Sequence, residues 1–153
     1  MMENKNLERK NINRGFKQLR VWQDAIQLYV MTTEIFSKLP YSQSKVATNA
    51  MDAAHSISRN ISEGYCRRSI KEYLNFLNYS LASCGELYSS YYACHAAKLI
   101  SETDFEKFDG LHYKLENQLL RLIESLQKKQ NQNDWNDSFA SEPPFQYSNI
   151  PSE

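Results

Sequence analysis

Glycine and proline are scarce in this sequence, with four of each among 153 residues. This scarcity disfavours a turn-rich β fold and favours helices. No apolar run approaches the roughly 18 residues that a membrane-spanning helix needs. The three cysteines form an odd set without a Cys-x-x-Cys pair, which disfavours a disulfide framework or a zinc site. We therefore expect one cytoplasmic domain whose thiols serve as small apolar groups.

Net charge is also absent, but only as an average over the chain. Residues 1–129 carry all 18 basic side chains and 14 acidic ones, whereas residues 130–153 carry four acidic side chains and no basic one. We predict a basic flexible arm at 1–18, a helical domain at 19–129 and an acidic, polar, disordered tail at 130–153. A basic arm attracts polyanions, although solvated terminal charge is the more common explanation.

Four segments of the helical domain show apolar residues at the three-and-four spacing of an amphipathic helix. They cover about residues 19–39, 42–63, 69–99 and 103–129. Because the links between them are short, we predict an all-α fold, an up-down four-helix bundle.

Particular residues indicate where these helices begin and end. Gly64 is expected to end the second helix in a left-handed conformation. Ser69 with Glu72 and Thr103 with Glu106 have the Ser/Thr-x-x-Glu spacing of a capping box. We therefore expect the third and fourth helices to begin at these two sites.

The apolar stripes of the second and third helices differ in character. Small side chains dominate the second, where the predicted core positions are Val46, Ala50, Ala53, Ala54, Ile57 and Ile61. The third helix has a main stripe that includes Tyr88 and Tyr92, and a second apolar row formed by Phe76, Leu87 and Cys94. Because this helix carries little charge, we predict that several faces are covered and that the second row contacts another subunit. A central helix in a tightly packed monomer is the alternative.

The sequence lacks the residue patterns of several enzyme classes. No Glu-x-x-His occurs, so the di-metal carboxylate motif of helical bundles is missing. His112 and Glu116 could touch one metal, but we expect them to form a surface hydrogen-bonded pair. Cys66 adjoins two arginines ahead of a helix, surroundings that lower a thiol pKa, but no base accompanies it. We predict no enzymatic activity, no cofactor, no metal and no small-molecule substrate.

Basic side chains concentrate around the expected turn between the second and third helices. Arg67, Arg68 and Lys71 lie at the start of the third helix, and Arg59 lies two turns back on the second. Arginines beside the unpaired N–H groups of a helix start form a favourable phosphate site. We predict that these residues bind nucleic acid together with the basic residues of the arm, Arg14, Lys17 and Arg20. The alternative is that Arg59 pairs with Glu63 and the other cations are solvated.

Three groups of residues in this part of the chain resemble a known family. The first group is Phe16-x-x-Leu19-x-Val21-Trp22-Gln23-x-Ala25, and the second is Ala53-Ala54-x-Ser56-Ile57-x-x-Asn60-Ile61-x-Glu63-Gly64. The third joins Arg68-Ser69-x-x-Glu72 to Phe76-Leu77 and Ser83-x-x-Glu86-Leu87. In this order over residues 16–128, they resemble the four-helix-bundle family of 23S rRNA intervening-sequence proteins.

The resemblance implies a four-helix protomer that assembles into a ring-like homopentamer. It also implies a bacterial protein whose family has no established biochemical role, and structural roles for Trp22, Asn60, Glu63, Gly64, Ser69 and Glu72. A related branch, the accessory variability proteins of diversity-generating retroelements, is strongly basic and binds nucleic acid and a reverse transcriptase.

The sequence departs from the family pattern at Met51-Asp52-Ala53-Ala54, where the family usually has Arg-Arg-Ala-Ala. Two positive charges are replaced by one negative charge, which lowers the expected affinity for phosphate. We therefore predict a non-enzymatic oligomeric scaffold or accessory protein that associates weakly with RNA or an RNA-bound protein. The alternative is a dedicated nucleic-acid-binding protein that repeats the arginine turn in an oligomer. A third hypothesis is that the acidic tail docks on a partner or on the assembly's own basic surface.

Overall fold

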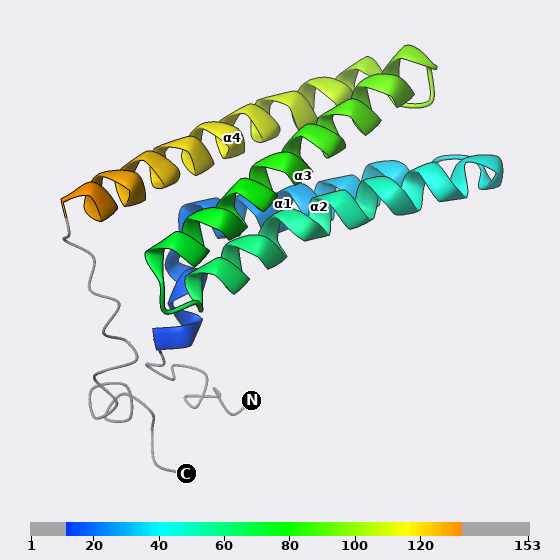
Figure 1. Ribbon diagram of the computed structural model, residues 1–153. Coiled ribbons are helices and arrows are strands. Elements are labelled where there is room, and N and C mark those ends of the chain that lie inside the picture. Colours follow the sequence, from blue (N-terminus) through cyan, green and yellow to red (C-terminus); the bar gives the residue numbers. More distant parts are fainter. Residues whose placement is uncertain (1–11, 133–153) are drawn as a thin grey trace, which may run out of the picture.

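The described part of the chain, residues 12–132, is all-helical in a computed structural model (Figure 1). Its four long helices are α1 (Arg20–Phe36), α2 (Ser44–Tyr65), α3 (Ile70–Ala96) and α4 (Glu102–Asn131). Two short 3-10 helices precede α1 and α2, namely η2 (Ile12–Gln18) and η3 (Tyr41–Gln43). No strand occurs within residues 12–132, so the predicted all-α class is confirmed. The rest of the predicted arm and tail lies outside the described residues.

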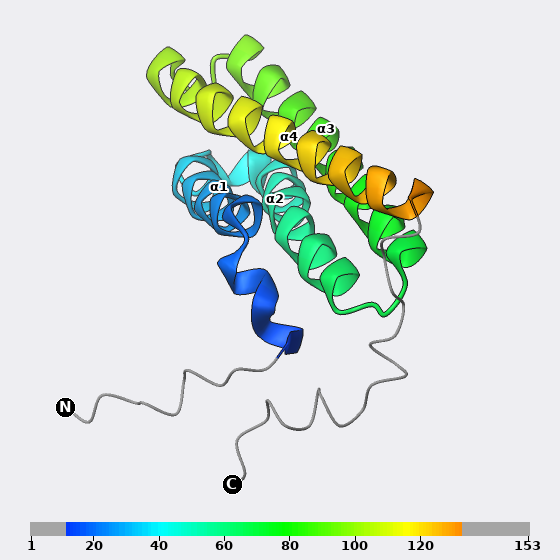
Figure 2. The same ribbon diagram turned by 90° about the vertical axis from the view of Figure 1, so that its left-hand side faces the viewer.

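Each long helix packs against two others. α1 contacts α2 and α4, and α3 also contacts α2 and α4, with the most extensive contact between α2 and α3 (Figures 1 and 2). α3 is therefore covered on two sides within a single chain. No helix of the described part is long and apolar enough to cross a membrane.

One hydrophobic core fills the space between the helices. Its largest fully buried rings are Phe36 of α1, Tyr91 of α3 and Phe108 of α4. Tyr91 stacks on Phe108 with ring centroids 3.5 Å apart and meets Phe36 edge to face at 4.8 Å. The Tyr91 hydroxyl donates a hydrogen bond of 3.0 Å to Thr32 Oγ1, which donates to the Leu28 carbonyl oxygen. These contacts join three helices and satisfy the buried hydroxyl groups.

The buried face of α3 differs from the predicted one. Leu87 and Cys94 are 0% and 3% exposed and belong to the core of the single chain, so the prediction that they contact another subunit is wrong. Tyr88 and Tyr92, assigned to the main core stripe, are instead 37% and 58% exposed. The side of α3 that faces α2 contains small polar residues such as Ser80, which the apolar pattern did not include. The helix is therefore rotated toward its second apolar row.

Small residues let α2 and α3 approach closely. A Cβ atom added at Gly64 would lie 2.8 Å from Phe76 Cβ, which is closer than packed side chains come. Ser80 Oγ donates a 3.0 Å hydrogen bond to a backbone carbonyl oxygen of α2, and the Oγ atoms of Ser56 and Ser83 lie 2.8 Å apart. The interface buries polar side chains, but their hydrogen bonds are made across it.

Most of the predicted core positions of α2 are confirmed, and two details of the prediction are wrong. Ala50, Ala53, Ala54, Ile57 and Ile61 are all buried, as expected. Val46 is 36% exposed and the neighbouring Ala47 is buried in its place. Gly64 does not end the helix, which continues to Tyr65, and no glycine within residues 12–132 has a positive φ. The predicted left-handed conformation is therefore wrong, and the close contact with α3 explains the glycine.

The starts of α3 and α4 test the two predicted capping boxes. Ser69 caps α3, because its Oγ accepts a hydrogen bond of 3.4 Å from the Glu72 N–H. The second prediction is wrong, since α4 begins earlier and its cap is Ser101 rather than Thr103. Ser101 Oγ accepts a 3.1 Å hydrogen bond from the Asp104 N–H. Its extended backbone precedes the first helical turn, as a cap residue requires.

The left-handed residue that ends a helix is Lys98, after α3. Its φ is 60°, and it is the single non-glycine residue within residues 12–132 with a positive φ. The Lys98 N–H donates to the His95 carbonyl oxygen at 3.0 Å, and the Leu99 N–H donates to that of Cys94 at 2.8 Å. This pair of bonds is the Schellman motif, in which glycine is the usual left-handed residue.

Candidate nucleic-acid interface

The 3-10 helix η2 is held against the end of α2. The Cys66 thiol donates a hydrogen bond of 3.2 Å to the backbone carbonyl oxygen of Asn13. The Phe16 ring lies edge to face with Trp22 and Tyr65, at centroid distances of 5.3 and 6.2 Å. These contacts fix η2, a segment that the sequence placed in the arm, and they give Phe16 of η2 its partners in α1 and α2.

The docking of η2 brings the two predicted basic groups to the same end of the molecule. η2 contacts α1 and α2, and Cys66 at the start of the α2–α3 link bonds it; Figure 1 shows the dark blue η2 beside that link. The residues involved, here called the basic end, are Arg14, Lys17, Arg20, Arg59, Arg67, Arg68 and Lys71. Cations from segments about 50 residues apart can thus face one polyanion.

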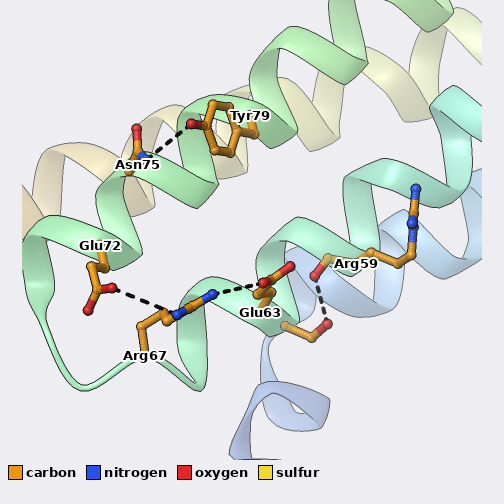
Figure 3. A network of polar contacts seen from close by, with 7 residues as sticks. Arg59, Glu63, Arg67, Glu72, Asn75 and Tyr79 are labelled. Atoms are coloured by element: carbon orange, nitrogen blue, oxygen red, sulfur yellow. Dashed lines mark hydrogen bonds and ion pairs between the residues drawn. The ribbon is translucent and has the colours of Figure 1, made fainter.

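Arg67 is engaged within the chain. Its Nη2 atom lies 2.9 Å from Glu63 Oε1, and its Nη1 atom lies 3.8 Å from Glu72 Oε1 (Figure 3). Its guanidinium carbon also lies 4.9 Å from the centroid of the Phe76 ring, a cation–π contact. Arg67 therefore joins α2 to α3 across the link, and its charge is partly neutralised.

The other cations of the basic end are less constrained. Figure 3 shows the Arg59 side chain directed away from Glu63, so the alternative pairing of these two residues does not occur. Within residues 12–132, Arg59, Arg68 and Lys71 are exposed and form no ion pair. The same holds for Arg14, Lys17 and Arg20, whose side chains are also exposed. Within the part of the chain that the structure describes, nothing neutralises these six exposed cations, which can therefore contact phosphate.

The Cys66 thiol is not activated, although its two arginine neighbours predict a lowered pKa. It lies at the C-terminal end of α2, where the helix dipole is negative, and partial burial raises its pKa above the ordinary value. A raised pKa leaves less thiolate near neutral pH. Together with the hydrogen bond to Asn13, this assigns Cys66 a role in holding η2 rather than in nucleophilic chemistry.

Asn60 supports the serine of α2 that bonds α3. Its Nδ2 atom donates to the Ser56 carbonyl oxygen at 2.8 Å and to Ser56 Oγ at 2.9 Å. Because Ser56 Oγ also bonds Ser83 Oγ of α3, the three side chains form one network. Asn60 thus sits in the position expected of a structural residue at the end of α2.

Two of the three histidines, His95 and His112, form polar pairs, and that of His112 differs from expectation. His112 Nδ1 lies 3.0 Å from Glu116 Oε1, so the predicted pair forms, but His112 is 1% exposed and the pair joins a buried ring to a partly exposed carboxylate rather than lying on the surface. His112 Nε2 lies 2.7 Å from the Cys84 carbonyl oxygen. His95 Nε2 lies 2.6 Å from Glu102 Oε2 across the α3–α4 link. Within the described residues, no group of three or more His, Cys, Asp or Glu side chains could hold a metal ion.

One exposed face of α3 consists mostly of small side chains and carries little charge. We call it the neutral face, and its residues are Asn75, Asn78, Tyr79, Ala82, Gly85, Glu86, Ser89, Ala93 and Ala96. Glu86 is its one charged residue, and a Cβ atom added at Gly85 would meet nothing within 4 Å. The face lies opposite the helix's core contacts. The sequence shows this composition, although the subunit contacts predicted from it were Phe76, Leu87 and Cys94.

Comparison with known proteins gives one family. The family model described as 23S rRNA-intervening sequence protein matches residues 17–126. This range includes α1, α2, α3 and most of α4, and every residue of the basic end except Arg14. No curated protein matches the chain.

Proposed function

Because the chain belongs to the 23S rRNA-intervening sequence protein family, we propose that it is a cytoplasmic, non-enzymatic, oligomeric scaffold that associates with RNA or an RNA-bound protein through its basic end. The observation that carries this proposal is the docking of η2, which adds Arg14 and Lys17 to the cations of the α2–α3 link. Phosphate binding by Lys and Arg releases counterions, so each added cation strengthens the attraction.

The proposed protomer is an up-down four-helix bundle, and the proposed assembly is a ring-like homopentamer. Short links between successive helices and the contact of each helix with two others support the bundle. The neutral face of α3 supports the assembly, because small uncharged side chains allow close helix approach, while a solvated face carries more charge. An oligomer would repeat the basic end and convert weak single contacts into useful avidity.

Charge reversal at Arg68 and Lys71 tests the RNA contact. The full-length double variant Arg68→Glu/Lys71→Glu should bind a structured RNA at least tenfold more weakly in fluorescence anisotropy, since two exposed cations that form no ion pair within residues 12–132 become anions. The slope of log affinity against log salt should also become shallower, by about 0.7 to 0.9 for each lost phosphate contact. Circular dichroism and light scattering would confirm that fold and assembly are unchanged.

The matched control reverses two exposed lysines elsewhere. Lys45 lies in the first turn of α2 and Lys107 in the first turns of α4, and neither forms an ion pair within residues 12–132. The Lys45→Glu/Lys107→Glu variant has the same net charge as the test variant and should retain most of the affinity. Equal losses in both variants, or binding that ignores salt, would contradict a contact through the basic end.

The second candidate is a dedicated nucleic-acid-binding protein. It is favoured by the six cations of the basic end that form no ion pair within residues 12–132. Affinity distinguishes the two proposals. A dedicated binder should reach the range of specific complexes at physiological salt, about 10⁻⁸ M or tighter, whereas weak association should remain near the non-specific range of about 10⁻⁶ to 10⁻⁴ M.

A further inference from the structure

The end of α4 lies at the same end of the molecule as the α2–α3 link and η2. Figure 1 shows the orange end of α4 beside the green start of α3, and Figure 2 shows the same arrangement from another side. α4 finishes with Lys128 and Lys129 in its last turn. The chain therefore continues beyond residue 132 from a point close to the basic end.

The sequence that follows has the opposite charge. Residues 133–153 contain four carboxylates, at Asp134, Asp137, Glu142 and Glu153, and no lysine, arginine or histidine. The same segment contains four aromatic side chains, those of Trp135, Phe139, Phe145 and Tyr147. The composition combines negative charge with apolar groups, as a ligand for a basic surface with nearby rings would require.

We propose that the basic end is an interaction surface for the chain's own residues 133–153, which occupy it in competition with RNA. The competition rests on the proposed function, which supplies RNA as the competitor. The docking itself does not require RNA. Carboxylates of this segment contact Arg59, Arg68 and Lys71, three of the exposed cations of the basic end that form no ion pair within residues 12–132. Arg67 is not a primary contact because Glu63 and Glu72 already hold it.

The chain length permits this contact. Twenty-one residues span up to about 70 Å when extended, whereas the whole of α4 is about 45 Å long. A segment tethered this closely acts at an effective concentration in the millimolar range. Individually weak carboxylate–guanidinium contacts can then compete with a polyanion supplied at lower concentration. The partly buried Phe76 and Tyr65 rings at the same end offer apolar contacts for the aromatic side chains.

Cys66 provides a reporter that does not depend on RNA. It is the exposed thiol of the three cysteines, since Cys84 and Cys94 are buried, and it lies at the basic end between α2 and α3. A docked segment should shield it. We therefore compare the rate at which DTNB modifies Cys66 in the full-length protein and in the variant Asp134→Asn/Asp137→Asn/Glu142→Gln/Glu153→Gln.

The matched control removes four carboxylates from elsewhere on the protein. Glu34, Asp52, Glu106 and Asp109 are exposed and form no ion pair within residues 12–132, so their amide variants alter net charge equally without touching the proposed segment. Neutralising the segment should raise the Cys66 modification rate at least twofold at low salt, and the control should leave it unchanged. Raising the salt to 1 M should bring the wild-type rate up to that of the variant, because screening weakens the docking.

The RNA measurement separates this proposal from the proposed function. The variant with a neutral segment should bind RNA about threefold to tenfold more tightly than the control variant, because an intramolecular competitor is removed. If no protein binds RNA but Cys66 becomes more reactive, the docking stands and the proposed function fails. If RNA binding depends on Arg68 and Lys71 while Cys66 reactivity and RNA affinity are the same in both variants, the docking is overturned and the proposed function stands.

Discussion

At the residue scale, side-chain volume decides how α2 and α3 meet. Gly64 is buried in α2, and an added Cβ atom would lie 2.8 Å from Phe76 Cβ and 3.2 Å from the Tyr73 carbonyl oxygen. Two of the three nearest atoms are thus close to or part of the α3 backbone, so they cannot move aside cheaply. The close approach of the helices is what requires glycine at this position.

Replacing Gly64 with alanine should therefore destabilise the protein, although alanine is the better helix former. We expect the free energy of unfolding to fall by about 1–3 kcal/mol in urea titrations because of overpacking. Gly110→Ala in α4 is the control, since a Cβ atom there meets nothing within 4 Å. That variant should gain up to about 1 kcal/mol from helix propensity. Equal effects of both substitutions would contradict the close-contact explanation.

The titration of the Cys84 thiol leads to a second prediction at this scale. Burial, with a smaller contribution from Glu116, raises its pKa from 9.0 to about 12. The folded state then holds the thiol proton more tightly than the unfolded chain, so stability is complete below pH 9 and is lost as the pH rises toward 12. Between pH 8 and 10.5, Cys84→Ala should lose about 2 kcal/mol less stability than wild type in urea titrations. An identical loss in both proteins would contradict this assignment.

At the scale of the helix, the ends of α4 and α3 depend on single residues. Ser101→Ala should lower the free energy of unfolding by about 1 kcal/mol, because the Asp104 N–H loses its cap. Thr103→Ala should change it by less than about 0.5 kcal/mol, since Thr103 is an exposed residue inside the helix. The reverse order of these two effects in thermal or urea unfolding would place the cap at Thr103.

Lys98 offers a stabilising substitution at the other side of the same link. A left-handed conformation costs about 1–2 kcal/mol for a residue with a Cβ atom and almost nothing for glycine. Lys98→Gly should therefore raise the free energy of unfolding by about 1 kcal/mol after the greater flexibility of unfolded glycine is counted. Lys107→Gly, inside α4, should lower it by a similar amount. A destabilised Lys98→Gly protein would contradict the Schellman geometry.

The helical network around Asn60 makes a prediction that concerns both α2 and α3. Asn60→Ala removes two hydrogen bonds to Ser56 and should cost about 0.5–1.5 kcal/mol of stability. Asn49→Ala, at an exposed position of the same helix, provides the control and should be close to neutral. If Asn60→Ala left both the melting temperature and the oligomer size unchanged, the structural role of Asn60 would be wrong.

How far the sequence predicts these elements depends on whether local or tertiary interactions decide them. The four helices and the Ser69 cap follow from periodicity and local hydrogen bonding, so the sequence is sufficient for them. The rotation of α3 is different, because buried Ser80 and Ser83 look like solvent-facing residues until their partners in α2 are known. The docking of η2 likewise depends on Tyr65 and Cys66, which lie about 50 residues away in the sequence.

The same distinction applies to the basic end. Sequence reasoning found all seven cations, because clustering of charge is visible in the chain itself. It could not show that Arg67, rather than Arg59, pairs with Glu63, because both arginines lie four residues from Glu63 in the sequence. The geometry of the link brings Arg67 between two carboxylates and leaves Arg59 exposed.

At the scale of the whole molecule, the neutral face of α3 links the fold to the proposed assembly. Arginine at Ala82 and Ser89, two exposed positions of this face, introduces charge without disturbing the core. If the face lies between subunits, Ala82→Arg/Ser89→Arg should give a folded monomer. That monomer should also lose the avidity for RNA that repeated copies of the basic end provide. Arginine at Thr48 of α2 and Ser125 of α4, which are exposed outside this face, is the matched control and should preserve the assembly.

The mass of the wild-type protein at micromolar concentration tests the central claim, an oligomeric scaffold, most directly. Size-exclusion chromatography with light scattering should give about five times the 17.9 kDa of one chain, and Ala82→Arg/Ser89→Arg should give a single chain with unchanged helicity. A wild-type mass of 17.9 kDa would contradict the assembly and, with it, the repeated basic end on which the proposed RNA association depends.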